Sequence, residues 1–69
     1  MLTLKDIQKL FDNAEYEKVE QELRVFLKDN PQNVEAWLLM GYTHYYLDDD
    51  QKALTCYRRV LEIDPKNAD

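Results

Sequence analysis

The chain has 69 residues and a formal net charge of −5, from 14 acidic and nine basic side chains. A chain of this length forms one small domain with a thin core, and its acidic excess is the opposite of what nucleic-acid binding requires. No segment approaches 18 consecutive apolar residues, so we expect no membrane span. The N-terminal residues lack the basic head and apolar stretch of a signal peptide, which predicts a cytoplasmic protein.

The first half of the chain predicts two helices. The first is expected from about Leu4 to Asn13, with Thr3 as its N-cap and Asp6 three residues later, a variant of the capping box. The second is expected from about Tyr16 to Lys28, because its apolar residues recur at helical spacing on one face. Pro31 ends this helix, since the residue before a proline is displaced from the helical region.

The second half predicts two more helices. The third is expected from Val34 to about Leu47 with Asn33 as its cap, and the fourth from about Gln51 to Ile63. Asp48, Asp49 and Asp50 supply the turn between them and a negative charge at the start of the fourth helix, where the helix dipole favours it. Gly41 lies inside the third helix at a cost of about 1 kcal/mol. We therefore expect the backbone of a neighbouring helix to approach it closely.

The chain repeats itself at a spacing of 34 residues. Identical and apolar residues coincide under this shift, at positions that belong to the predicted core and helix ends. The period predicts two helix pairs, residues 1–33 and 34–67, within one small domain of residues 1–69. The five identical pairs are Lys18 and Lys52, Arg24 and Arg58, Leu27 and Leu61, Pro31 and Pro65, and Asn33 and Asn67.

The second unit contains a spaced set of aromatic, small and proline residues: Trp37, Met40, Gly41, His44, Ala53, Tyr57 and Pro65. This set resembles the signature of the tetratricopeptide repeat, which is W-x₂-L-G-x₂-Y, then A-x₃-F, then P. His44 in place of tyrosine is the one marked departure. The first unit is more degenerate, with Ile7 at the glycine position and Thr3 at the tryptophan position. The resemblance implies an all-α solenoid of two antiparallel helix-turn-helix repeats, four helices in all, stacked into a right-handed superhelix.

The resemblance also implies an inner groove, lined by the first helix of each pair, that binds a peptide or helix of a partner protein. Tyrosine suits such a surface because it combines a large apolar face with a hydrogen-bonding tip. Phe11 and Tyr45 have an alternative role, which is packing between the helices. The groove positions in this chain are Leu4, Gln8, Phe11, Leu38, Tyr42, Tyr45 and Tyr46.

A clamp for a terminal carboxylate is not expected. Relatives that bind a chaperone's C-terminal carboxylate use Lys, Arg and Asn on the inner face. The matching positions here include Leu4, Gln8, Leu38, Leu39 and Tyr42, with Lys5 as the only cation nearby. A peptide with apolar anchors and basic flanks fits this surface and the net charge better.

A second hypothesis is self-assembly through the repeat ends. Two repeats are fewer than the three that stability normally requires, so we expect Leu54, Tyr57 and Leu61 to form an open end that drives homo-oligomerisation. The family's glycine between paired helices is replaced by Ala14 and by Asp48. A weakly specified turn of this kind opens a route to domain swapping.

No feature of the sequence predicts catalysis, a cofactor or a metal site. His44, the only histidine, is expected to pack in the core. Cys56, the only cysteine, has no neighbouring His to activate it. The run Asp48, Asp49 and Asp50 lacks the ligand spacing of an EF-hand loop. We therefore predict a binding module and not an enzyme.

Overall fold

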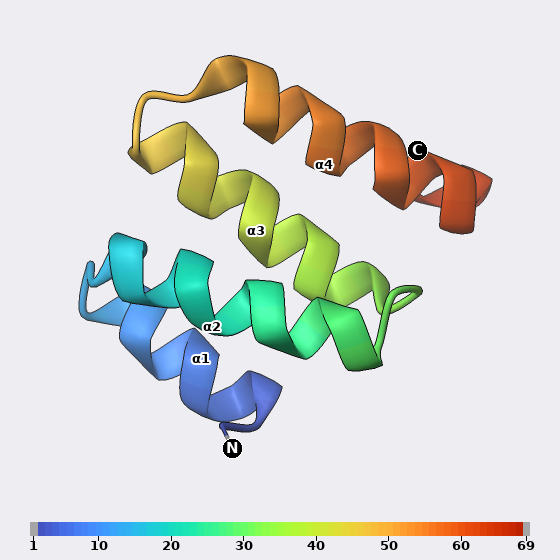
Figure 1. The fold of residues 1–69 in the computed structure, drawn as a ribbon. Helices are drawn as coiled ribbons and strands as arrows, with labels where there is room; N and C mark the ends of the chain where they lie inside the picture. Colours follow the sequence, from blue (N-terminus) through green and yellow to red (C-terminus); the bar gives the residue numbers. More distant parts are fainter. Residues whose placement is uncertain (1, 69) are drawn as a thin grey trace.

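The computed structural model describes residues 2–68, whose regular elements are α-helices and one short 3₁₀ helix, so the predicted all-α fold is confirmed. Figure 1 shows the helices stacked one after another in chain order, with α1 and α4 at the two ends of the stack. Met1, Asp69 and the side chains of Asn67 and Ala68 lie outside the described part. The elements are α1 (Leu4–Asp12), α2 (Tyr16–Asp29), α3 (Val34–Tyr46), α4 (Asp50–Ile63) and a short 3₁₀ helix, η1 (Pro65–Ala68).

The predicted helix caps are present. The hydroxyl of Thr3 accepts a hydrogen bond from the Asp6 N–H, and the Asp6 carboxylate accepts one from the Thr3 N–H at 3.1 Å, which completes a capping box. The side chain of Asn33 accepts from the N–H of Ala36 at 3.0 Å. Asp49 caps α4 in the same way, so that helix begins one residue earlier than the predicted Gln51.

The second helix of each pair follows the 34-residue period to the residue. Adding 34 to the bounds of α2, 16 and 29, yields the bounds of α4, 50 and 63. The ends of α1 and α3, residues 12 and 46, have the same spacing. The turn residues match as well, because Ala14 and Asp48 both have a φ of 62°. Each unit thus makes a left-handed turn without the family's glycine, although a residue with a Cβ atom is strained there.

The core lies between the two pairs. α2 contributes Val19, Leu23 and Leu27 to it from one face, as its sequence spacing predicts. α1 contributes Ile7, while Phe11 and Trp37 pack against the cluster from its edge. The remaining buried residues of the core cluster are Ala36, Leu39, Met40 and Cys56.

Gly41 is close to a neighbouring helix, but the prediction that the neighbour is backbone is wrong. A Cβ atom added at Gly41 would lie 2.5 Å from Cε1 and 3.0 Å from Cδ1 of Tyr57 on α4. The aromatic ring fills the space that a side chain on Gly41 would need. The glycine therefore makes room for a tyrosine ring in the packing of α3 against α4.

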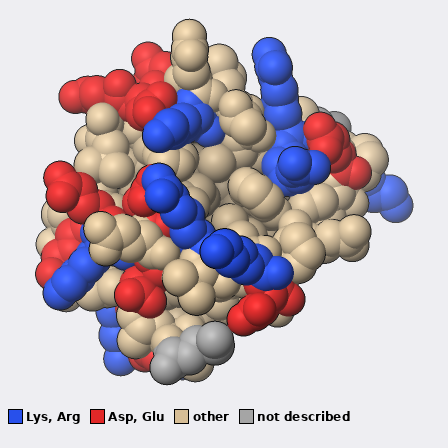
Figure 2. Space-filling view, viewed as in Figure 1, with Lys and Arg blue, Asp and Glu red and all other residues tan. Residues whose placement is uncertain are grey.

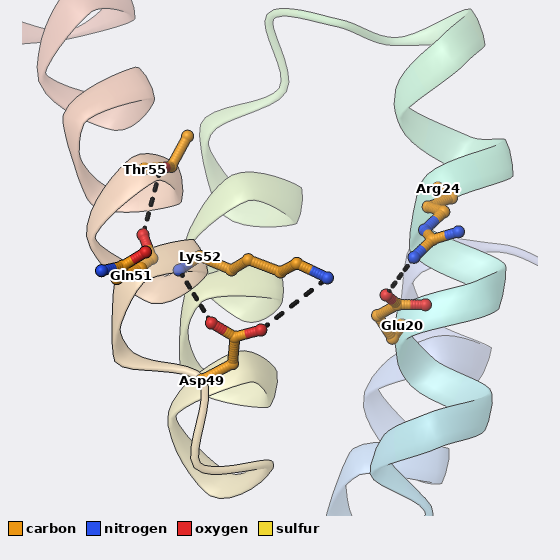
Figure 3. Close-up of polar contacts among 6 residues, drawn as sticks. All are labelled: Glu20, Arg24, Asp49, Gln51, Lys52 and Thr55. Atoms are coloured by element: carbon orange, nitrogen blue, oxygen red, sulfur yellow. Dashed lines mark hydrogen bonds and ion pairs between the residues drawn. The ribbon is translucent and has the colours of Figure 1, made fainter.

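The outer surface carries short-range polar contacts. On the face in Figure 2, basic and acidic side chains are interspersed. Figure 3 shows Arg24 paired with Glu20 on α2, and Lys52 paired with Asp49 at the start of α4 at 3.7 Å. The hydroxyl of Thr55 donates to the Gln51 carbonyl within α4 at 3.0 Å. Exposed pairs of this kind contribute roughly 0–1 kcal/mol each, so the apolar core holds the helices together.

Candidate functional site

A continuous groove runs along α1 and α3. It consists of three adjoining hollows, with volumes of about 260, 370 and 410 Å³. The first two share Gln8, Glu35 and Leu39, and the last two share Phe11 and Tyr42. We call this surface the inner groove. All seven residues that the sequence analysis assigned to a groove line it: Leu4, Gln8, Phe11, Leu38, Tyr42, Tyr45 and Tyr46.

One end of the inner groove is entirely aromatic. The hollow at this end is lined by five residues, and we call it the aromatic hollow. Tyr42, Tyr45 and Tyr46 remain 47, 60 and 54 % exposed, so their rings are open to solvent and available for contact. Surface tyrosines this exposed contribute little to the core and much to a potential interface. The five residues are Phe11, Tyr42, Tyr45, Tyr46 and Tyr57.

The rings hold one another in place by edge and face contacts. The ring of Tyr46 stacks on that of Tyr16 at 4.9 Å and meets the Phe11 ring edge-on at 5.8 Å. Tyr45 in turn meets Tyr46 at 5.5 Å and an interplanar angle of 80°. Aromatic pairs in these geometries add about 0.5–1.5 kcal/mol beyond area burial. Phe11 thus has both roles that the sequence left open, because it packs on Tyr16 at 5.3 Å and also lines the groove.

Tyr57 lies in the wall of the groove. Its ring is half-buried over Gly41 and lies 6.1 Å from the Tyr42 ring, at an angle of 59°. Burial raises the pKa of its hydroxyl, and the neighbouring hydroxyl of Tyr42 raises it further. Tyr57 therefore remains a neutral phenol. Its position differs from that of Leu54 and Leu61, the other two residues assigned to an open end, which are 54 and 43 % exposed.

Four residues that line the hollows are absent from the groove set predicted from the sequence: Lys5, Glu35, Leu39 and Tyr57. Glu35 lines two hollows, and its spacing of three residues from Leu38 and seven from Tyr42 puts it on the same helix face, a signal available in the sequence. Tyr16 supports Tyr46 from the start of α2. No local pattern predicts that contact, because the stack joins the two helix pairs.

The residues considered for chemistry are buried or belong to a turn. His44 is 6 % exposed, and burial lowers the pKa of its imidazole. Cys56 is 4 % exposed, and burial raises the pKa of its thiol to about 11. Within the described part of the chain, no three His, Cys, Asp or Glu residues are grouped to hold a metal ion. No helix there is long and apolar enough to cross a membrane.

Comparison with known proteins identifies a family model and several relatives that match the sequence. Residues 34–67 match the family model of the tetratricopeptide repeat. The chain is 38 % identical over 64 residues to peroxisome biogenesis protein 5 of Arabidopsis thaliana. The aligned region covers 93 % of the chain and 9 % of that protein. It is 34 % identical over 55 residues to DnaJ protein P58IPK homolog B of rice (Oryza sativa subsp. japonica), covering 80 % of the chain and 12 % of that protein.

A third relative is the peroxisomal targeting signal 1 receptor of Dictyostelium discoideum. It is 42 % identical to the chain over 38 residues, which cover 55 % of the chain and 6 % of the receptor. The chain therefore spans about a tenth of the length of these relatives. No solved structure matches the chain significantly.

Proposed function

The chain belongs to the tetratricopeptide repeat family, and on this premise we propose that its inner groove binds a peptide or helix of a partner protein. Repeats of this family generally mediate protein–protein interaction and act as scaffolds. We also propose that α1 and α2, in residues 1–33, form a first, degenerate repeat before the repeat at residues 34–67, both within one small domain. The 34-residue spacing of α2 and α4 supports this division.

The observation that carries the proposal is the continuity of the groove. Its three hollows join end to end, so one extended segment can occupy them together. Leucine, phenylalanine and tyrosine rings in the groove provide anchoring area, and the tyrosine hydroxyls and Gln8 provide hydrogen-bonding groups for a peptide backbone. The name of one relative, a receptor for a targeting signal, supports recognition of a short segment.

A peptide display screen against the full chain tests the proposal, with variants that separate the groove from the outer face. Tyr42→Ala and Tyr46→Ala remove exposed rings from the groove. Val25→Ala is a matched control, because Val25 on α2 is 50 % exposed and lines none of the groove's hollows. We expect selected peptides to lose at least about tenfold in affinity with either tyrosine variant and to keep it with the control. Peptides that bind all three variants equally would refute the groove.

Self-association is a second candidate function, supported by Leu54 and Leu61 on α4. The two side chains are seven residues apart, hence on one face of the helix, and both are largely exposed. A second copy, or the next repeat of an array, would bury them, and each buried leucine contributes about 1.5–3 kcal/mol.

Sedimentation equilibrium over a concentration series tests this second candidate. We expect the chain to form dimers or larger assemblies as the concentration rises, and the double variant Leu54→Gln and Leu61→Gln to remain monomeric. A native chain that stays folded and monomeric throughout the series would rule out assembly through α4.

A further inference from the structure

We propose that the aromatic hollow binds a cationic side chain, Arg or Lys, of the partner segment that occupies the inner groove. This inference rests on the proposed groove function and adds the chemistry of one anchor. The hollow is lined by Phe11 and four tyrosines and by no charged residue, so its recognition depends on the ring faces and on the surrounding electrostatic field.

The rings leave faces available to a guest. Tyr42 and Tyr57 meet at 59° with centroids 6.1 Å apart, so they do not cover each other by stacking. Tyr45 meets Tyr46 edge-on, which also leaves a face of one ring uncovered by the other. The face of a tyrosine ring carries negative charge and attracts a cation within about 6 Å of its centroid. Several faces around one hollow add to this attraction.

The surrounding backbone and acidic side chains favour the same sign of guest. Phe11 is the next-to-last residue of α1, and Tyr45 and Tyr46 are the last two of α3, so the hollow lies at the C-terminal ends of both helices. A helix C-terminus carries a partial negative charge. Asp12 ends α1, and Asp48 follows α3 by two residues. The four ion pairs among the described residues involve neither carboxylate, although Asp12 accepts a hydrogen bond from Gln8. α3 contains no Lys or Arg, and the last turn of α1 holds one lysine, Lys9.

The chain itself makes a contact of the proposed kind at another site. The guanidinium carbon of Arg59 lies 5.6 Å from the ring centroid of Trp37. It is the one such contact within the described residues, so no cation from that part of the chain occupies the tyrosine faces. Within the described residues, Trp37 thus has a cation over its ring, whereas the tyrosines of the aromatic hollow have none.

Proline is the main competing guest, because aromatic-lined grooves also bind proline-rich segments. A proline ring would use the apolar area of the hollow but would gain nothing from the two helix ends or from Asp12 and Asp48. The charge around the hollow therefore favours a cation over proline.

Titration of the full chain, with its tyrosine rings isotope-labelled for NMR, tests the proposal. The probes are the Nα-acetyl N-methylamides of arginine, of citrulline and of proline. Citrulline has nearly the shape of arginine without the charge. We expect arginine to shift the ring signals of Tyr42, Tyr45 and Tyr57 with about tenfold higher affinity than citrulline or proline. Added salt should weaken binding of the arginine probe only.

Two variants at Tyr45 separate ring chemistry from folding. Its ring is the most exposed of the set, so neither variant should unfold the chain, and circular dichroism checks this. Tyr45→Leu should reduce the preference for arginine over citrulline several-fold, and Tyr45→Phe should retain most of it. Equal affinity for arginine and citrulline, a preference for proline, or shifts at rings outside the hollow would each overturn the cation site.

These outcomes are distinguishable from failure of the groove function. A screened peptide that Tyr42→Ala releases, but whose affinity is unchanged when arginine is replaced by citrulline, would leave groove binding intact and refute the cation site. A clear arginine preference in the titration, with no peptide recovered from the screen, would support the cation site and count against peptide binding by the groove.

Discussion

Replacing Ala14 by glycine should stabilise the protein. Ala14 has a φ of 62° in the turn between α1 and α2, a conformation that costs a residue with a Cβ atom roughly 1–2 kcal/mol. Glycine removes this cost but makes the unfolded chain more flexible, which offsets about 0.4–1 kcal/mol. The net expectation is a free energy of unfolding higher by about 0.5–1 kcal/mol, or a rise in Tm of about 2–8 °C for a domain of this size.

Urea unfolding followed by far-UV circular dichroism measures this change, with Gln21→Gly as the matched control. Gln21 is exposed in the middle of α2, where glycine should lower the free energy of unfolding by about 1 kcal/mol. Introducing glycine should thus raise the free energy of unfolding at position 14 and lower it at position 21. Asp48→Gly should stabilise less than Ala14→Gly, because aspartate tolerates the left-handed region better than alanine does. A destabilised Ala14→Gly variant would refute the reasoning.

Three further predictions concern the core. Gly41→Ala should lower the free energy of unfolding by about 1 kcal/mol, because overpacking against the Tyr57 ring outweighs the gain in helix propensity. Adding Tyr57→Leu to this variant should restore the free energy of unfolding in the same urea assay. Burial raises the pKa of the Cys56 thiol to about 11, so iodoacetamide at pH 8 should modify it at least about a hundredfold more slowly in the folded than in the urea-unfolded chain. Equal rates, measured by mass spectrometry, would contradict its burial. Burial lowers the pKa of His44, so on acidification the imidazole is protonated at a higher pH in the unfolded chain than in the folded chain. The free energy of unfolding should therefore fall as the pH drops below about 6.5. His44→Phe should flatten this pH dependence, and an unchanged pH dependence would mean that another group causes it.

Local patterns in the sequence predicted the helices well. Thr3, Asn33 and the acidic run before α4 marked the helix starts, and all three starts have side-chain caps. Each predicted helix end lies within one residue of the observed one. These features depend on residues three or four positions apart, so they can be read before the chain is folded.

The groove set came from the resemblance to the tetratricopeptide repeat, and helix spacing agrees with it. Leu38, Tyr42 and Tyr45 are separated by four and three residues, which puts them on one face of α3 in any packing arrangement. Leu4 and Phe11 of α1 correspond to Leu38 and Tyr45 under the 34-residue shift, and they line the same groove.

The sequence by itself thus determined the helices, their caps and the faces on which the tyrosines lie, because each depends on near neighbours in the chain. Only the tertiary structure decided that Tyr57 occupies the space above Gly41 and that Tyr16 stacks on Tyr46. Both contacts join residues from different helices, and ring orientation depends on the close packing of all their neighbours at once. The shape of the aromatic hollow depends on the same packing.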